Sequence, residues 1–233
     1  MITVLTSSYK HGKFLQESIN SVLNQTYTDF VYHLIDDGSS DETSQIMFET
    51  SKKDSRIKMF TLPKQPTTAH ILNMSIGMTE TKYWCWAHAD DVLDTKLLQK
   101  KFDLAEKNPN TVVYGYVFDH IDAEGKYIKT EIIEEKTPEE FRQHIKVCCE
   151  VTFCGILIPM SVFKIVGNFP NDTVWSEDFL WTLIACKKGI DFIGLKDNSF
   201  KKRIHNDRVS YEKRYEIQNS MKIFRKRVEE MSI

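Results

Sequence analysis

Two apolar runs that end in paired carboxylates constrain the fold of this chain more than any other feature. Residues 31–35 lead directly into Asp36-Asp37, and residues 83–87 lead into Asp90-Asp91 after two intervening residues. Runs rich in β-branched and aromatic residues are typical of buried strands, so each predicts a strand that delivers acids to its carboxyl end. In open α/β sheets, ligands bind at that edge. Because adjacent carboxylates repel each other, a crowded pair indicates a nearby cation or hydrogen-bonding ligand.

The first half of the chain alternates between strand and helix patterns. Strands are expected at residues 2–6, 31–35, 57–60 and 83–87. Helices are expected in the intervals after them, at residues 14–23, from Asp41 as N-cap, at 68–78 and from 97 onward. This order predicts a parallel sheet flanked by helices.

The second half is more mixed. Strands are expected at residues 112–118, 127–130, 152–158, 191–195 and 200–204. A hairpin turn is expected at residues 122–125, and helices at 138–149, opened by Thr137 as cap, and at 179–188. Nothing in the composition marks a boundary, so we expect one α/β domain over residues 1–233.

Composition excludes several classes of protein. The net charge of −2 gives no reason to expect nucleic acid as a partner, and no apolar stretch approaches the length of a membrane span. The N-terminus lacks the basic leader and apolar core of a signal peptide. The five cysteines are odd in number and form no Cys-x-x-Cys motif, which favours reduced thiols in a cytoplasmic protein and predicts no zinc site from their spacing.

Four groups of residues form a recognisable series along the chain. The first runs from Thr6 to Leu15, through residues 21–27, and on through residues 35–41. The later three are Asn73 to Gly77, Ala89-Asp90-Asp91 and Trp175-Ser176-Glu177-Asp178. In this order they resemble the motifs of glycosyltransferase family 2, which has the GT-A fold.

The resemblance implies an inverting enzyme with a GT-A, Rossmann-like, mixed and mainly parallel sheet. Its donor would be a nucleotide sugar, UDP-linked, and its acceptor a hydroxyl of a glycan or lipid-linked molecule in surface polysaccharide synthesis. Residues 1–110 would bind the nucleotide and residues 111–210 the acceptor. Residues 211–233 form an amphipathic, partly basic helix. It is expected to dock on its own domain or on a second subunit, with peripheral membrane contact as the alternative.

A divalent cation, Mn²⁺ or Mg²⁺, is implied as cofactor, because it stabilises the charge of a departing diphosphate. By resemblance, Asp91 is a direct metal ligand and Asp90 contacts the ribose or the metal. His205 would complete the metal shell or touch the diphosphate, with Arg203 or Arg208 nearby; an ordinary packed histidine is the alternative. His88 stands where the family often has an acid, and a donor contact, a group beside the metal or a packed residue all remain open.

The nucleotide contacts are implied in the same way. Asp36 and Asp37 suit a base imide N–H or ribose hydroxyls, because carboxylates accept hydrogen bonds; the alternative is that they hold the following turn. The backbone of the loop from Thr6 through Ser8, with Tyr9, would surround the base. Lys64 and Asn73 are expected nearby.

The catalytic base is expected at Asp178, since inverting transfer needs a group that takes the proton of the acceptor hydroxyl. Glu177 would position the acceptor or the backbone. The alternative is that both acids only stabilise the start of the following helix.

Two other functions are weighed against a transferase. A sugar-nucleotide nucleotidyltransferase usually has a Gly-rich first loop, and residues 6–12 are not Gly-rich. A non-catalytic nucleotide-sugar-binding protein conflicts with the presence of Asp91 and Asp178, although His88 keeps it open. A dehydrogenase is not expected, because no Gly-x-Gly-x-x-Gly follows the first strand.

Overall fold

Four parallel strands make up one half of the sheet. In the computed structural model, which describes residues 1–147, 151–173, 176–208 and 213–231, they are β1 (Ile2–Ser8), β2 (Phe30–Asp36), β3 (Ile57–Thr61) and β4 (Tyr83–Trp86). Helices α1 (Gly12–Leu23), α2 (Thr43–Ser51) and α3 (Thr68–Gly77) connect them. The order β3-β2-β1-β4 puts the carboxyl ends of these strands at one edge.

The other half of the sheet is mixed. Strand β8 (Thr152–Pro159) runs antiparallel to β4, and β6 (Val112–Ile121) lies between β8 and β9 (Phe192–Arg203). The short β5 (Val92–Leu93) pairs with β9, and β7 (Tyr127–Ile132) forms a hairpin with β6. The expected mixed sheet in a single helix-flanked domain is confirmed.

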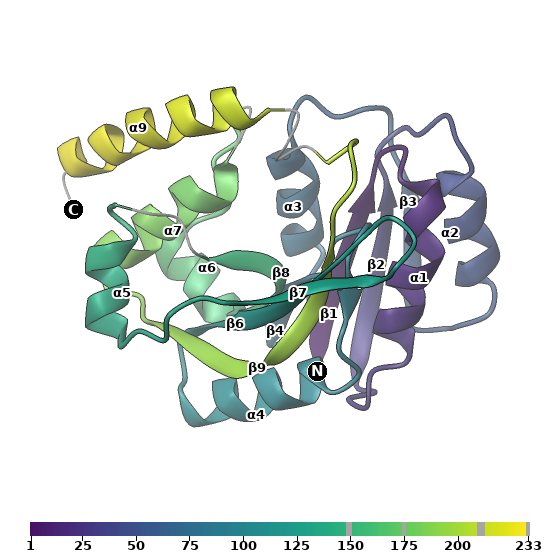
Figure 1. The fold of residues 1–233 in the computed structure, drawn as a ribbon, viewed down its shortest axis with the longest axis horizontal. Helices are drawn as coiled ribbons and strands as arrows, with labels where there is room; N and C mark the ends of the chain where they lie inside the picture. The colour runs from purple at the N-terminus through teal and green to yellow at the C-terminus, as the bar shows by residue number, and fades with distance from the viewer. Residues whose placement is uncertain (148–150, 174–175, 209–212, 232–233) are drawn as a thin grey trace.

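Helices cover both faces and one end of the sheet. Beyond α3 they are α4 (Leu97–Lys107), α5 (Pro138–His144), α6 (Met160–Val166), α7 (Glu177–Lys187) and α9 (Arg214–Glu230). Figure 1 shows α5, α7 and α9 at the end of the molecule opposite α1 and α2. The cap at Thr137 is confirmed, since its hydroxyl accepts from Glu140 N while the Glu140 carboxylate accepts from Thr137 N.

The core consists of one apolar cluster on each face of the sheet. Alternation along a strand divides the side chains, so that Val4 and Leu5 of β1 enter different clusters. Trp84 and Trp181 are fully buried in the cluster under α3, α6 and α7, whereas Tyr32 lies in the cluster under α1 and α4. The sheet is therefore rigid on both faces, and its strand ends are held in fixed positions.

Some element boundaries differ from expectation. The region predicted as two strands is the single strand β9, which runs through the polar residues 196–199 because register shifts against β6 absorb them. Helix α7 begins at Glu177. Helix α2 begins at Thr43 with Glu42 at the N-cap position, so the expected cap at Asp41 was wrong; the Asp41 carboxylate accepts from Gly12 N as well as from Thr43 N. The helix expected at 138–149 ends at His144, and Cys148 and Cys149 lie outside the described residues. Strand β5 and helix α6 were not predicted.

The C-terminal helix docks on its own domain. Phe224 and Val228 of α9 are buried in the core, and Lys187 of α7 donates to the carbonyls at the end of α9, among them Met231 O at 2.7 Å. Arg225 donates to Val147 O at 2.6 Å. This confirms the docking expected for the amphipathic stripe. Among the described residues, no helix combines the length and apolar character needed to cross a bilayer.

Candidate active site

The carboxyl ends of β1 and β2 bring together the first group of expected residues. Asp37 N donates to Ser8 O at 2.9 Å, which fixes the two strand ends side by side. The Asp37 carboxylate pairs with Lys64 and accepts from Gln65 N at 2.7 Å. The Lys64 ammonium also lies 4.2 Å from the centre of the Tyr9 ring. Tyr9, Asp37 and Lys64 thus form one polar group at the sheet edge.

Three residues expected at the nucleotide have their side chains committed elsewhere. The buried Thr6 hydroxyl contacts the Tyr32 hydroxyl and donates to Ala87 O at 3.0 Å, so only its backbone can face a ligand. The Asn73 amide exchanges two hydrogen bonds with the backbone of Phe169, at 2.8 and 2.9 Å. The buried Asp36 accepts from Ser39 N at 3.0 Å, which is the turn-holding role named as its alternative. The nucleotide contacts expected of the Thr6 backbone and of Asn73 stay predictions, while the Asn73 amide already holds α3 against the backbone of Phe169.

Ser8 lies at the same strand end, and its hydroxyl is available to a ligand. It is the last residue of β1, and its buried Oγ has no hydrogen-bond partner among the described residues. A buried polar atom without a partner is unusual in native structures and calls for an explanation such as a ligand or water.

The second acidic pair, Asp90-Asp91, follows β4 and is surrounded by basic groups. Arg208 Nη1 contacts Asp90 Oδ2 at 3.2 Å and Asp91 Oδ1 at 3.0 Å. His205 Nε2 lies 3.1 Å from Asp90 Oδ2, and Arg203 N donates to Asp91 Oδ1 at 3.0 Å. His205 thus approaches Asp90 rather than Asp91.

These contacts keep both carboxyls ionised. Burial and the neighbouring Asp91 raise the pKa of Asp90, but His205, Arg208 and His88 outweigh them and the pKa lies below its usual range. Burial likewise raises the pKa of Asp91, and the charge of Arg208 with the adjacent His88 brings it well below the ordinary value. The pair is therefore a fixed source of negative charge.

The two carboxylate oxygens of Asp91 differ, because Oδ1 accepts the hydrogen bonds described above and Oδ2 does not. Asp91 Oδ2 is buried and has no hydrogen-bond partner among the described residues, and His88 Nδ1 lies 3.3 Å away. His88, Asp91 and Cys154 place their ligand atoms within 4.8 Å of one another. Carboxylate, imidazole and thiol are all metal ligands, so this donor set fits a divalent cation.

A third acidic pair, Glu177-Asp178, opens α7 and has a different environment. Burial and the adjacent Asp178 raise the pKa of Glu177 to about 8. Burial also raises the pKa of Asp178, against the hydrogen bond from Phe179 N at 2.7 Å and the nearby charge of His88. Asp178 itself is only half-buried, so an incoming molecule can reach it. Trp175, which belongs to the same motif, lies outside the described residues.

Arg203 connects the pair Asp90-Asp91 to helix α1 and to the β6–β7 turn. It is fully buried, and its guanidinium donates to Asp90 O at 3.0 Å, pairs with Glu17 of α1, and reaches Asp122 O and Ala123 O in the β6–β7 turn. The sequence indicated Arg203 only as a charge beside His205. The sequence did not predict these contacts of Arg203, because all the partners are distant from it in sequence.

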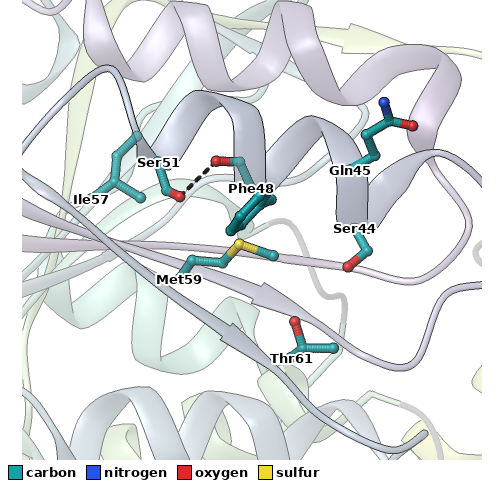
Figure 2. Close-up of a pocket in the computed structure, with 7 residues that line it drawn as sticks. All are labelled: Ser44, Gln45, Phe48, Ser51, Ile57, Met59 and Thr61. Carbon is teal, nitrogen blue, oxygen red and sulfur yellow. Dashed lines mark hydrogen bonds between the residues drawn. The ribbon is translucent and has the colours of Figure 1, made fainter.

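An open cavity elsewhere on the surface holds none of these acids. It has a volume of about 620 Å³ and lies between α2 and the edge strand β3, where Phe48, Ile57 and Met59 line it (Figure 2). Serine and threonine hydroxyls and the Gln45 amide make up its polar lining, and no charged side chain lines it. The strand ends, not this cavity, hold the candidate active site.

Comparison with known proteins shows the family. Residues 3–164 match the model of "Glycosyl transferase family 2". The chain is 34% identical over 136 residues to an uncharacterized glycosyltransferase of Haemophilus influenzae, which covers 58% of this chain and 38% of that protein. It is 24% identical over 127 residues to the glycosyltransferase GlyG of Streptococcus pneumoniae, which covers 54% of this chain and 42% of that protein. The chain therefore belongs to glycosyl transferase family 2, and it spans about two fifths of these two relatives.

Solved structures show the same fold. Staphylococcus aureus TarS, in a complex with UDP-GlcNAc, superimposes with a TM-score of 0.71 at 17% identity, covering 96% of this chain and 66% of that chain. The mannosyltransferase PcManGT of Pyrobaculum calidifontis, in a complex with GDP-Man and Mn²⁺, superimposes with a TM-score of 0.73 at 13% identity, covering 99% of this chain and 65% of that chain. The GT-A fold expected from the sequence is confirmed.

Proposed function

We propose that this chain is an inverting, metal-dependent glycosyltransferase of the cytoplasm. It moves a sugar from a nucleotide-sugar donor, UDP-linked, to a hydroxyl of a glycan or lipid-linked acceptor in surface polysaccharide synthesis. One observation supports this most strongly. The ionised pair Asp90-Asp91 and the candidate base Asp178 both lie near His88, whose Nδ1 is 3.3 Å from Asp91 Oδ2 and whose charge lowers the pKa of Asp178. Transfer to an alcohol needs both a site for a charged leaving group and a separate proton acceptor.

The nucleotide would lie along the ends of β1 and β2. Tyr9 offers a ring for the base, and Asp37 accepts hydrogen bonds while Lys64 offsets its charge. Both neighbours described above were solved with a nucleoside diphosphate sugar, one of uridine and one of guanosine. Uracil and guanine each present an N–H that a carboxylate such as Asp37 can accept, and the UDP-linked donor is the one we propose.

The diphosphate would lie beside Asp90 and Asp91. Asp91 Oδ2 and His88, whose Nδ1 lies 3.3 Å from that oxygen, are the groups placed to hold a divalent cation, with Asp90 beside them. Such an ion, when bound, neutralises the charge that builds on the leaving diphosphate. Arg208 and Arg203 hold the two carboxylates in place before the donor arrives, so no reorganisation is needed during the reaction.

Asp178 would take the proton of the acceptor hydroxyl. Its raised pKa brings it closer to the working pH than an ordinary aspartate, which favours proton transfer in the transition state. Glu177 is more deeply buried and keeps its own proton near neutral pH, so it lends Asp178 no second negative charge. This arrangement leaves one acid to act as the base.

The experiment is a panel of nucleotide sugars tested for stabilisation and for turnover. A donor that binds only the folded chain raises its melting temperature, and we expect UDP-sugars with Mn²⁺ to give the largest rise. Slow donor hydrolysis that requires the cation and is lost in Asp178→Asn supports a transferase. Release of pyrophosphate from a nucleoside triphosphate would instead indicate a nucleotidyltransferase. Binding without turnover, with or without added acceptors, would leave a non-catalytic nucleotide-sugar-binding protein.

A further inference from the structure

We propose that a cavity between helices α5, α7 and α9 binds a small amphipathic anion, of the class of a medium-chain carboxylate. These helices lie at the end of the molecule opposite α1 and α2 (Figure 1), and the cavity has a volume of about 290 Å³. Small-molecule sites begin at roughly 300 Å³, so the space suits one small molecule. Within the described part of the chain, no acid of the candidate active site lines it. The inference goes beyond the proposed function and does not depend on sugar transfer.

The apolar part of the cavity lining comes from all three helices. Leu183 and Cys186 belong to α7, Val228 belongs to α9, and Ile145 is the residue that ends α5. Leu183 and Cys186 are three positions apart, so they share one face of α7. Because these side chains offer water almost no hydrogen bonds, an apolar chain that displaces water from them gains free energy.

The charged part of the lining carries an excess of cations. Arg142 is balanced by its ion pairs with Glu139, at 2.9 Å, and with Asp191. Among the described residues, the other three cations of the lining hydrogen-bond only to neutral groups; they are Lys146, Lys187 and Arg225. The one remaining acid, Glu229, is exposed to solvent. The cavity therefore favours an anion over a neutral or cationic molecule.

Arg225 supplies a hydrogen-bond donor that the described residues do not use. Its Nη2 donates to Val147 O at 2.6 Å, and its guanidinium carbon lies 5.4 Å from the centre of the Phe179 ring, so the side chain is held in place. Its Nε is buried and has no hydrogen-bond partner among the described residues. A buried donor without a partner costs free energy, and a carboxylate oxygen is a strong acceptor for a guanidinium N–H. A bound carboxylate would therefore satisfy this atom.

The carbonyl end of α9 beside the cavity would by itself repel an anion, because the last turn of a helix carries partial negative charge. Lys187 offsets this charge. Its ammonium donates to Val228 O, to Glu229 O at 3.1 Å and to Met231 O at 2.7 Å. The cations left for a ligand are then Lys146, which follows α5, and Arg225 on α9. Two cations beside an apolar surface suit a single carboxylate at the end of a hydrocarbon chain.

Calorimetric titration of the full chain with octanoate tests the site. We expect saturable binding of one octanoate per chain. Three matched compounds separate the two parts of the ligand: 1-octanol lacks the charge, octylammonium reverses it, and acetate lacks the chain. Each should bind roughly tenfold more weakly or worse. Arg225→Met should weaken octanoate by a similar factor, whereas Arg227→Met, which removes an exposed arginine of the same helix, should leave its affinity unchanged.

Equal affinity for octanoate and octanol, or equal octanoate affinity in the two arginine variants, would overturn the site. If Arg225→Met fails to fold, a photoreactive diazirine analogue of octanoate on the unaltered chain decides the question. Crosslinks within residues 142–146, 183–187 or 225–229 that excess octanoate prevents support the site, and crosslinks only elsewhere, or none, overturn it. Neither readout uses a nucleotide sugar, so failure here leaves the proposed function standing, and absence of sugar turnover leaves this site standing.

Discussion

The pairs Asp90-Asp91 and Glu177-Asp178 are both adjacent acids at the end of a buried element, yet their environments are opposite. Arg208 touches both members of the first pair, and Arg203 N and His205 add further donors. Within the described residues, His88 is the only basic group that lowers the pKa of Asp178, and none lowers the pKa of Glu177. The comparison teaches that an adjacent pair of acids is fully ionised or retains a proton according to the cations that the fold places beside it.

The largest effect, on the free energy of unfolding, is expected when Arg208 is removed from the pair Asp90-Asp91. In Arg208→Met, two buried carboxylates lose their shared partner, and breaking a buried ion pair costs about 3–5 kcal/mol of unfolding free energy. Urea denaturation at neutral pH measures it. The control Arg227→Met removes an exposed partner of Asp172, 2.9 Å away, and should cost less than about 1 kcal/mol. Equal losses in the two variants would contradict the contrast.

The next effect is on catalysis by the second pair. Asp178→Asn keeps the shape of the side chain but cannot accept the acceptor's proton, so turnover should fall roughly a hundredfold or more. Donor binding, measured by calorimetry, should stay nearly unchanged. Asp172→Asn, an exposed acid in the segment before α7, is the matched control and should keep full turnover. A fully active Asp178→Asn chain would remove Asp178 from the role of base.

The third effect is a pH dependence of stability that comes from Glu177. Its pKa is about 8 in the folded chain, against 4.5 as its ordinary value, so the folded state holds a proton that the unfolded state has released. Stability should therefore fall as pH rises from about 4.5 to about 8, by up to about 1.4 kcal/mol per pH unit. Glu177→Gln should flatten that slope. Melting curves across this range test it, and an unchanged slope would mean that Glu177 ionises normally.

The smallest effect is expected at Lys64, which offsets Asp37. Lys64 is 52% exposed, so solvent screens its ion pair, and Lys64→Met should change stability by less than about 1 kcal/mol. Because Lys64 also lies over Tyr9, UDP binding should weaken several-fold. Calorimetric titration compares it with Lys82→Met, which removes an exposed partner of Glu106 and should bind UDP normally. Equal affinity in the two variants would remove Lys64 from the site.

Local pattern predicted much of the fold and the acids of the site. The strand runs, the helix periodicity and the Thr137 cap depend on neighbouring residues, and they were confirmed. The partners of those acids could not be found in this way. Arg208 contacts Asp91 across 117 positions of sequence, and Cys154 approaches His88 only because β8 runs antiparallel to β4.

The same limit applies to the direction in which individual side chains point. Thr6 and Asn73 lie where the family's motifs suggested ligand contacts, but their polar atoms are used by Ala87 and Phe169, 81 and 96 positions away. A motif places a residue near the sheet edge without showing which way its hydroxyl or amide turns. The polar run at 196–199 looked like a turn because the register shifts that carry β9 through it belong to the pairing with β6.

Infrared spectroscopy of the folded chain tests the central contrast most directly, because the C=O stretch of a protonated carboxyl is separate from the bands of a carboxylate. We predict that this stretch is present at neutral pH, fades as pH rises past about 8 and is lost in Glu177→Gln, while Asp91→Asn leaves it in place. If the stretch is missing at neutral pH, or is insensitive to Glu177→Gln, the two pairs carry the same charge and the account is wrong.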